Sequence, residues 1–272
     1  MNILTIDVEE WFTMSAGGSG FPSCSRLERE LEVLTEIVGG GGAKATFFIS
    51  GEIVNNHKEL LRELAREFDI GLHGYRHVCA GRMSVAEFRQ DVLRAKDTVE
   101  TLLGRRVTKF RAPYFAISKE YVKELFDCGI ETDCSCASIN HQFGKRVIDF
   151  SEPCVLEYGG RTMREFPPSP IFCLGMGCGF LGGGYFRLLP YRMVSSFSNR
   201  NKDYLLSYIH PRDLDADQPL LPGLSPLRRF KSYVGLKGAE KKLRRWLADY
   251  TFTDIATAEE RIDWQAVPVV HL

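Results

Sequence analysis

The sequence predicts an α/β fold in which parallel strands alternate with helices, as a barrel or as an open sheet. In the first half of the chain, short apolar runs alternate with segments whose apolar residues repeat at helical spacing. Polar side chains suited to chemistry directly follow several of these runs. The 272 residues are 44% hydrophobic, enough for one large core. No linker, repeat or low-complexity segment divides them, so we expect a single domain over residues 1–272.

The charge balance argues against some classes of partner. Lysine and arginine total 35, as do aspartate and glutamate, and the pI is about 7.0, so no net field favours nucleic acid. No apolar stretch approaches the roughly 20 residues of a transmembrane helix, and the first residues lack the pattern of a secretory signal. The eight cysteines show no paired metal-binding spacing. We therefore expect reduced thiols in a cytoplasmic protein that has no nucleic-acid partner.

The first predicted strand ends in a group of carboxylates. Ile3 to Ile6 has the pattern of a buried strand, and Asp7, Glu9 and Glu10 follow it, with Trp11 next. A solvated turn would explain such a group. A general base beside a ligand for a hard metal ion would explain it as well.

Further strands and helices follow in alternation. They are a helix over 27–38, a strand over 45–49, a helix over 53–64, a strand over 68–72 and a helix over 84–103. Ser84 with Glu87 three residues later forms the pattern of a capping box at the start of the last helix, and Gly104 marks its end.

Two histidines come directly after the strand over 68–72. His73 and His77 are four residues apart, a spacing that lets two imidazoles share one metal ion. Gly74 favours a turn over a helix at this point. Two surface histidines would show the same spacing, so the surrounding residues must decide.

Arg111 follows the next short apolar run, in the stretch Phe110 to Phe115. A helix over 118–128 and a strand over 130–136 come after it. The arginine thus lies, like Asp7 and His73, at or just beyond the carboxyl end of a predicted strand. Active sites of parallel α/β proteins form at these ends, so we expect the three side chains to lie together.

The second half of the chain is less regular. The prolines over 165–170 predict an extended loop. The run over 177–182 has the spacing G-x-G-x-x-G, but prolines precede it and glycines follow, which favours a flexible loop over the site to a nucleotide site. A helix over 185–197 is interrupted near Pro190. A strong strand over 204–209 ends at His210.

A basic helix is predicted near the end of the chain. Leu243, Trp246, Leu247 and Tyr250 form its apolar stripe, and its opposite face is rich in lysine and arginine. The basic side chains are Lys241, Lys242, Arg244 and Arg245. Such a face can contact a membrane surface, although a solvated helix that packs on the core explains it better.

The residues at the strand ends match the requirements of one reaction type. Two histidines and one carboxylate form a ligand set with open positions, suited to catalytic zinc or another divalent ion. A further carboxylate and a further histidine are the base and the acid that metal-assisted hydrolysis needs. The sequence therefore favours a metal-dependent hydrolase.

Five motifs in order resemble one family. They are Thr5 to Phe12, Ala45 to Ile49, Ile70 to His77, Phe110 to Phe115 and Tyr208 to Pro211. This order resembles the polysaccharide deacetylases, the NodB-homology or family 4 carbohydrate esterases. The segments over 165–167 and 182–187 resemble the branch found in bacterial exopolysaccharide and O-antigen gene clusters.

The resemblance implies a distorted (β/α) barrel and the metal-dependent removal of an acetyl group from an N-acetylated sugar. It implies that His73 and His77 bind the metal and that Asp7 is the general base. Arg111 matches the arginine that keeps the base ionised. Tyr114 lies where the family uses a backbone N–H to stabilise the oxyanion, and His210 matches the histidine that protonates the leaving amine.

One position departs from the commonest family pattern, which has two adjacent aspartates. Val8 stands where the second, a metal ligand, is expected. Some members place the ligand two residues after the base, which here is Glu9. Because side chains two apart on a strand share a face, Asp7 and Glu9 can both point inward. Glu9 is our predicted ligand, and Glu10 is the alternative.

The predicted cofactor is a divalent metal, zinc first, with cobalt, nickel or iron as alternatives. Trp11, Tyr114 and Phe166 are candidates for stacking on the sugar, and core packing explains each of them equally well.

We expect the substrate to be an N-acetylated amino-sugar glycan or a lipid- or nucleotide-linked precursor of O-antigen or exopolysaccharide. A cytoplasmic enzyme at the inner membrane face would act on such precursors. A small-molecule amidohydrolase and a non-catalytic sugar-binding or scaffold protein are the alternatives. The oligomeric state stays open.

Overall fold

One ten-stranded sheet forms the centre of the computed structural model, which describes residues 1–13, 24–141, 143–173, 176–200 and 203–272. Its strands are β1 (Asn2–Val8), β2 (Thr46–Ile49), β3 (Asp69–Leu72), β4 (Lys109–Phe110), β5 (Thr132–Asp133), β6 (Cys154–Tyr158), β7 (Arg161–Glu165), β10 (Leu205–Ile209), β11 (Phe252–Thr253) and β12 (Val269–His271). They follow the order β10-β1-β2-β3-β4-β5-β7-β6-β12, and β11 pairs with β1.

The sheet is parallel except for the β6–β7 pair. Parallel neighbours bring the carboxyl ends of β10, β1, β2, β3 and β4 to one edge, as the sequence predicts. The α/β fold with alternating strands and helices is therefore confirmed. The order of the strands also means that the last strand before His210 lies directly beside the first strand of the chain.

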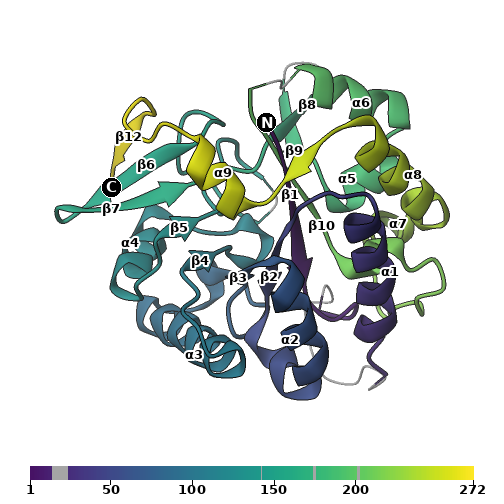
Figure 1. Cartoon of the computed structure of the whole chain (residues 1–272), viewed down its shortest axis with the longest axis horizontal. Helices are drawn as coiled ribbons and strands as arrows, with labels where there is room; N and C mark the ends of the chain where they lie inside the picture. Colours follow the sequence, from purple (N-terminus) through teal and green to yellow (C-terminus); the bar gives the residue numbers. More distant parts are fainter. Residues whose placement is uncertain (14–23, 142, 174–175, 201–202) are drawn as a thin grey trace.

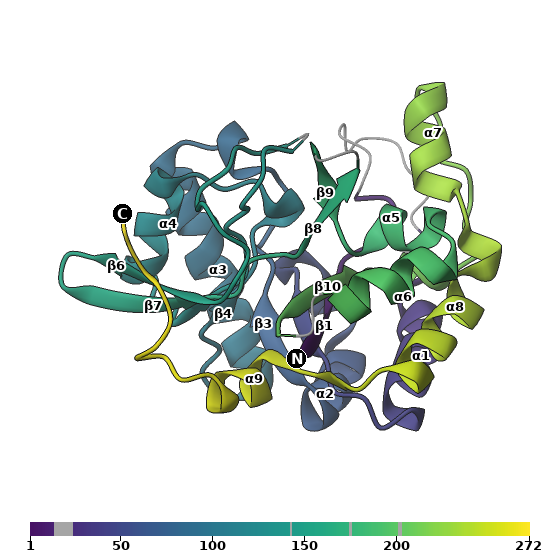
Figure 2. The same ribbon diagram turned by 90° about the horizontal axis from the view of Figure 1, so that it is seen from above.

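Helices lie on the outside of the fold, and most of them pack against the strands. They are α1 (Leu27–Gly40), α2 (Lys58–Glu67), α3 (Val85–Leu103), α4 (Lys119–Asp127), α5 (Gly183–Leu188), α6 (Tyr191–Arg200), α7 (Pro226–Tyr233), α8 (Leu236–Asp249) and α9 (Ile255–Arg261), with short 3₁₀ turns η1 (Gly51–Asn56), η2 (Ala80–Arg82), η3 (Pro113–Phe115) and η4 (Pro211–Leu214). In both views α1 to α4 run along the outer side of the sheet (Figures 1 and 2).

The signals at the ends of α3 act as the sequence predicts. Ser84 accepts a hydrogen bond from the Glu87 backbone N–H, and the Glu87 carboxylate accepts one from the Ser84 N–H. Gly104 ends the helix with φ 66°, a left-handed conformation that favours glycine. The predicted helix over 53–64 is instead divided into η1 and α2.

The glycine-rich run over 177–182 is not the flexible loop that the sequence predicted. Most of it forms β9 (Met176–Phe180), which pairs antiparallel with β8 (Pro170–Cys173). Its glycines permit close packing, because a Cβ at Gly177 would lie 2.8 Å from a methyl group of Ile139.

The basic face of α8 is already engaged within the chain. The Lys242 Nζ donates to the carbonyl oxygens of Phe186, Arg187 and Leu189 at 2.7–2.9 Å. Arg244 pairs with Glu36 and Glu240, and Arg245 pairs with Asp249. These contacts favour a solvated helix that packs on the core over a membrane-binding face. No helix of the described part of the chain is long and apolar enough to cross a membrane.

Glu30 is an acid on the buried face of α1, only 2% exposed. Burial raises the pKa of Glu30 to about 8, and Asp215 adds to the rise while Arg212 opposes it. The ordinary pKa is 4.5, so the folded chain holds an extra proton between pH 4.5 and about pH 8. The stability that this proton contributes is complete below pH 4.5 and is lost as the pH rises toward 8.

We predict that Glu30→Gln changes the free energy of unfolding little at about pH 5 and increases it by about 1–3 kcal/mol at about pH 8.5, because the amide stays neutral. Urea unfolding at both pH values measures the difference. Glu32→Gln, at an exposed position of the same helix, is the matched control. An equal effect of Glu30→Gln at both pH values would contradict the assignment.

Candidate metal centre and active site

The carboxyl ends of β1 and β3 bring the predicted side chains together. Asp7 lies near the end of β1, and Glu9 follows one residue beyond that end. His73 directly follows β3. Gly74 then turns the chain with φ 71°, and a Cβ there would lie 3.1 Å from the Asp91 carboxylate. This turn returns His77 to the side of His73.

Glu9, His73 and His77 form a candidate metal centre, with one ligand atom from each residue within 4.8 Å of the others. The Glu9 Oε2 lies 2.7 Å from the His77 Nε2. The Glu9 Oε1 is buried and has no hydrogen-bond partner among the described residues. A buried carboxylate with a free oxygen beside two imidazoles is a donor set that fits a divalent ion.

Neighbouring groups hold the two histidines in place. The His73 Nδ1 donates to the backbone carbonyl oxygen of Arg111 at 2.9 Å, which leaves Nε2 with the lone pair that a metal needs. Burial lowers the pKa of His73 to about 4, so its imidazole is neutral at pH 7. The Glu52 carboxylate accepts a hydrogen bond from the backbone N–H of His77.

The geometry favours Glu9 over Glu10 as the carboxylate ligand. Glu10 points to another partner, with its Oε1 3.4 Å from the His57 Nε2. It does not belong to the group that Glu9 forms with His73 and His77. Burial acts to raise the pKa of Glu9, but His77, His210 and His73 together more than offset this and lower it to about 2.

Asp7 and Arg111 form a buried ion pair next to the metal centre. The Arg111 Nη1 lies 2.8 Å from the Asp7 Oδ1, and the guanidinium is fully buried. The same nitrogen donates to the Thr5 Oγ1 at 2.6 Å. Burial alone would raise the pKa of Asp7. Arg111, His73 and His210 act in the opposite direction and together outweigh burial, so the pKa of Asp7 lies below its ordinary value. Asp7 is therefore an ionised carboxylate that can accept a proton.

His210 faces the metal centre from the end of β10. Its Nε2 lies 3.7 Å from the Glu9 Oε1, and its Nδ1 lies 3.0 Å from the Asp213 Oδ2. Burial acts to lower the pKa of His210, but Asp213, Glu9 and Asp7 together more than compensate and raise it to about 9. The histidine is thus protonated at neutral pH, as a general acid must be.

Sequence reasoning missed the partners of His210. The Arg187 Nε lies 2.9 Å from the other Asp213 oxygen, so Asp213 is held from two sides. The sequence did contain a pattern that indicates Asp213. An acid three residues after His210 has the spacing of a capping box, and Asp213 accepts a hydrogen bond from the His210 backbone N–H at the start of η4. Arg187, which comes from α5, ends the segment over 182–187 that carries part of the family resemblance, but nothing in the sequence indicated its contact with Asp213.

Tyr114 lies over the metal centre in a strained turn. Its φ is 62° and that of Phe115 is 53°, which non-glycine residues rarely adopt. The Tyr114 ring contacts the His77 ring with centroids 4.4 Å apart and the Phe143 ring at 4.7 Å. Phe143 is 42% exposed and is an aromatic group that the sequence analysis did not identify.

The prediction that Trp11 and Phe166 stack on a sugar is contradicted by their burial. Trp11 is 1% exposed, and its Nε1 donates to the carbonyl oxygen of Cys24 at 3.2 Å. Phe166 is fully buried and packs edge-on against Trp264. Neither ring offers a free face, so core packing, the alternative interpretation, holds for both.

A second group of potential metal ligands lies at the ends of β5 and β7. Asp133, Cys136 and Glu165 are fully buried and close together. Burial raises the pKa of both acids, and a hydrogen bond joins the two carboxyl groups. A proton shared between Asp133 and Glu165 explains this pair without a metal.

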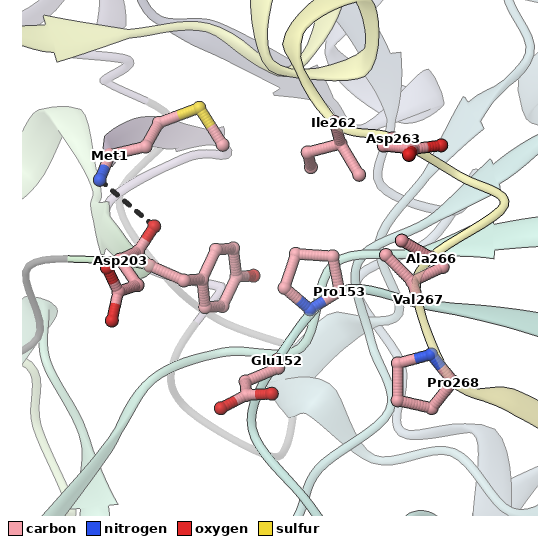
Figure 3. Close-up of a pocket in the computed structure, with 10 residues that line it drawn as sticks. Met1, Glu152, Pro153, Asp203, Ile262, Asp263, Ala266, Val267 and Pro268 are labelled. Atoms are coloured by element: carbon pink, nitrogen blue, oxygen red, sulfur yellow. Dashed lines mark hydrogen bonds between the residues drawn. The ribbon is translucent and has the colours of Figure 1, made fainter.

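A pocket of about 360 Å³ lies at the other end of the strands (Figure 3). Met1, which precedes β1, and Asp203, which precedes β10, lie on its wall. The Met1 amino group donates to the Asp203 carbonyl oxygen at 3.1 Å. The amino ends of these strands are far from Asp7 and His210, so this pocket is separate from the candidate site.

Comparisons with known proteins agree with the fold. Residues 30–132 match the family model described as polysaccharide deacetylase, and residues 134–259 match a domain of unknown function (DUF3473). PdaC of Bacillus subtilis, a peptidoglycan-N-acetylmuramic acid deacetylase, is 35% identical over 77 residues, which are 28% of this chain and 16% of that protein. PgdA of Listeria monocytogenes, a peptidoglycan-N-acetylglucosamine deacetylase, is 30% identical over 83 residues, 30% of this chain and 18% of that protein. The matches thus span less than a fifth of these relatives.

Solved structures share the fold. A Mycobacterium smegmatis protein assigned as a polysaccharide deacetylase superposes with a TM-score of 0.69 at 17% identity, covering 100% of this chain and 92% of that one. BA3943 of Bacillus anthracis, a family 4 carbohydrate esterase pseudoenzyme, gives a TM-score of 0.51 at 15% identity, over 100% of this chain and 68% of that one.

The strand order and the site define a class, the distorted (β/α) barrels with a candidate metal centre of two histidines and one carboxylate. Within this class, residues 30–132 of the chain match the polysaccharide deacetylase family.

We predict that Glu9→Gln weakens zinc binding by about 100-fold or more, because it removes a ligand, whereas altered neighbours of ligands alone cost about 10- to 100-fold. Glu10→Gln is the matched control and should bind zinc like wild type. Isothermal titration calorimetry of metal-free protein measures both affinities. Wild-type affinity in Glu9→Gln, or a loss in Glu10→Gln instead, would contradict the assigned ligand set.

Proposed function

We propose that this chain is a metal-dependent hydrolase that removes the N-acetyl group from an amino sugar of a bacterial glycan or its precursor. One observation carries the proposal: an ionised carboxylate, Asp7, and a protonated imidazole, His210, both border the group formed by Glu9, His73 and His77. An amide hydrolysis needs a base, an acid and a means to stabilise an oxyanion, and these side chains supply them.

Asp7 takes the part of the general base. It accepts a proton from a water molecule, whose oxygen then attacks the carbonyl carbon of the acetamido group. Arg111 keeps Asp7 ionised and, through two hydrogen bonds to Asp7 and Thr5, fixes the direction of the carboxylate. A positioned base contributes typically about 10²- to 10⁴-fold in rate.

Glu9, His73 and His77 would hold the divalent ion, for which zinc is the first candidate and cobalt, nickel or iron are alternatives. Such an ion would supply Lewis acidity that polarises the acetyl carbonyl group and makes water more acidic. The Tyr114 backbone N–H acts as a further donor to the oxyanion, and the left-handed turn at this residue sets its direction.

His210 takes the part of the general acid. It donates its proton to the nitrogen of the amine as the carbon–nitrogen bond breaks, and acetate is the second product. Asp213 holds the imidazole by its Nδ1 and leaves Nε2 directed toward the site. Arg187 holds Asp213, so it acts on the acid by positioning.

The proposed catalytic unit draws on both matched regions and on the first strand. His73, His77 and Arg111 lie within residues 30–132, and His210 and Asp213 lie within residues 134–259, whereas Asp7 and Glu9 precede both regions. We propose that residues 1–272 act as one catalytic domain on O-antigen, exopolysaccharide or a lipid- or nucleotide-linked precursor. Phe143, exposed beside Tyr114, is the surface on which a neighbouring sugar stacks.

Replacing the base tests the proposal. In Asp7→Asn, we predict that kcat for acetate release from N-acetylated chito-oligosaccharides falls by about 10²- to 10⁴-fold. The amide oxygen still accepts from Arg111, and thermal unfolding checks that the variant folds. Zinc affinity should match that of wild type, because Asp7 is not a ligand. Unchanged kcat in Asp7→Asn would remove the proposed base, and a wild-type chain that binds sugar and metal without releasing acetate would indicate the non-catalytic alternative.

A further inference from the structure

Helix α7 differs from the other long helices of the fold because none of its side chains is buried. Residues 225–231 are all exposed. Leu227 is 64% and Phe230 is 54% exposed, and these two residues, three apart, share one face of the helix. Leu220, in the segment before α7, is 57% exposed. A short helix in water gains its stability from a buried apolar face, and α7 has none within the chain.

The charge of α7 is entirely positive. Arg228, Arg229 and Lys231 lie on it, and residues 218–239 contain no aspartate or glutamate. No ion pair within the described part of the chain involves these three cations, in contrast with Arg244 and Arg245 of α8. The helix therefore presents an apolar edge and uncompensated positive charge together.

Although exposed, α7 is held firmly at its carboxyl end. The Arg187 guanidinium donates to the carbonyl oxygens of Lys231, Ser232 and Val234 at 2.8–3.1 Å. Arg187 also binds Asp213, which binds His210. The position of α7 is thus fixed relative to the candidate site by a short chain of contacts.

The β8–β9 hairpin, which carries another exposed apolar residue, lies on the same side of the fold as α7. Figure 2 shows α7 and the β8–β9 hairpin projecting from the body of the fold in the same direction. Phe172 of β8 is 54% exposed. Burial is the main cause that raises the pKa of Tyr114, and the positive charge of Arg228 opposes this rise. Arg228 of α7 is thus near enough to the candidate site to act on Tyr114, so α7 lies on the same side of the fold as the site.

We propose that α7, with Leu227 and Phe230 inserted and its three cations at the headgroups, docks the protein on an anionic lipid bilayer. Exposed apolar side chains that project singly and are surrounded by lysine and arginine suit the interface of an anionic bilayer. A protein partner would instead need a complementary groove for each of these side chains. The bound orientation presents the site to glycans at that surface. This docking is independent of the proposed reaction.

Vesicle binding tests the proposal without any turnover. The full chain is sedimented with vesicles of phosphatidylcholine alone or with about 30% phosphatidylglycerol, and we expect partitioning onto the anionic vesicles at least about tenfold higher, falling with added salt. Leu227→Ser with Phe230→Ser, and separately Arg228→Gln with Arg229→Gln and Lys231→Gln, should each abolish most of this gain. Because these side chains are exposed, thermal unfolding should not change.

Leu93→Ser is the matched control, since Leu93 is 44% exposed but lies on α3, and it should bind vesicles like wild type. Three results would overturn the proposal: no binding of wild type, equal binding to neutral vesicles, or full binding by the α7 variants. Size-exclusion chromatography measures whether the exposed face of α7 instead binds a second copy of the chain. A wild-type dimer that the Leu227→Ser, Phe230→Ser variant converts to a monomer would assign this face to a second copy of the chain and overturn docking on lipid.

Discussion

The buried contact between Arg111 and Asp7 is the interaction on which the site depends. Burying two charges is costly and is offset only by close pairing and further hydrogen bonds. The Arg111 Nη1 donates to Asp7 and to Thr5 and its Nε donates to the Cys134 carbonyl oxygen, while its Nη2 has no partner among the described residues. The backbone carbonyl oxygen of the same arginine fixes the His73 ring. One residue at the end of β4 therefore sets the charge of the proposed base and the orientation of a proposed ligand.

The strand order explains why residues so distant in sequence share one site. Because β10 pairs with β1 in parallel, His210 leaves the sheet beside Asp7 and Glu9. The second half of the chain then holds His210 through Asp213 and Arg187. The proposed base, Asp7, and the proposed acid, His210, have pKa values moved in opposite directions, the arrangement that would let both act at one pH.

Much of the site could be predicted because it follows a local rule: polar residues directly after apolar strands meet at one edge of the sheet. Asp7, His73 and Arg111 obey it. The choice of Glu9 over Glu10 needed only the alternation of a strand. Burial could not be predicted, since a motif gives the residue type but not what covers it, and Trp11 and Phe166 proved to be core residues. The contact of Arg187 with Asp213 depends on tertiary structure alone.

The most direct test of this account is to count metal and acetate together. Metal-free protein is titrated with zinc while acetate release from N-acetylated chito-oligosaccharides is measured. The account predicts that the rate rises linearly and stops at about one equivalent of zinc, as a single site of three protein ligands requires. Acetate release that is independent of metal would contradict the account. So would a chain that binds one equivalent tightly and releases no acetate from any N-acetylated sugar.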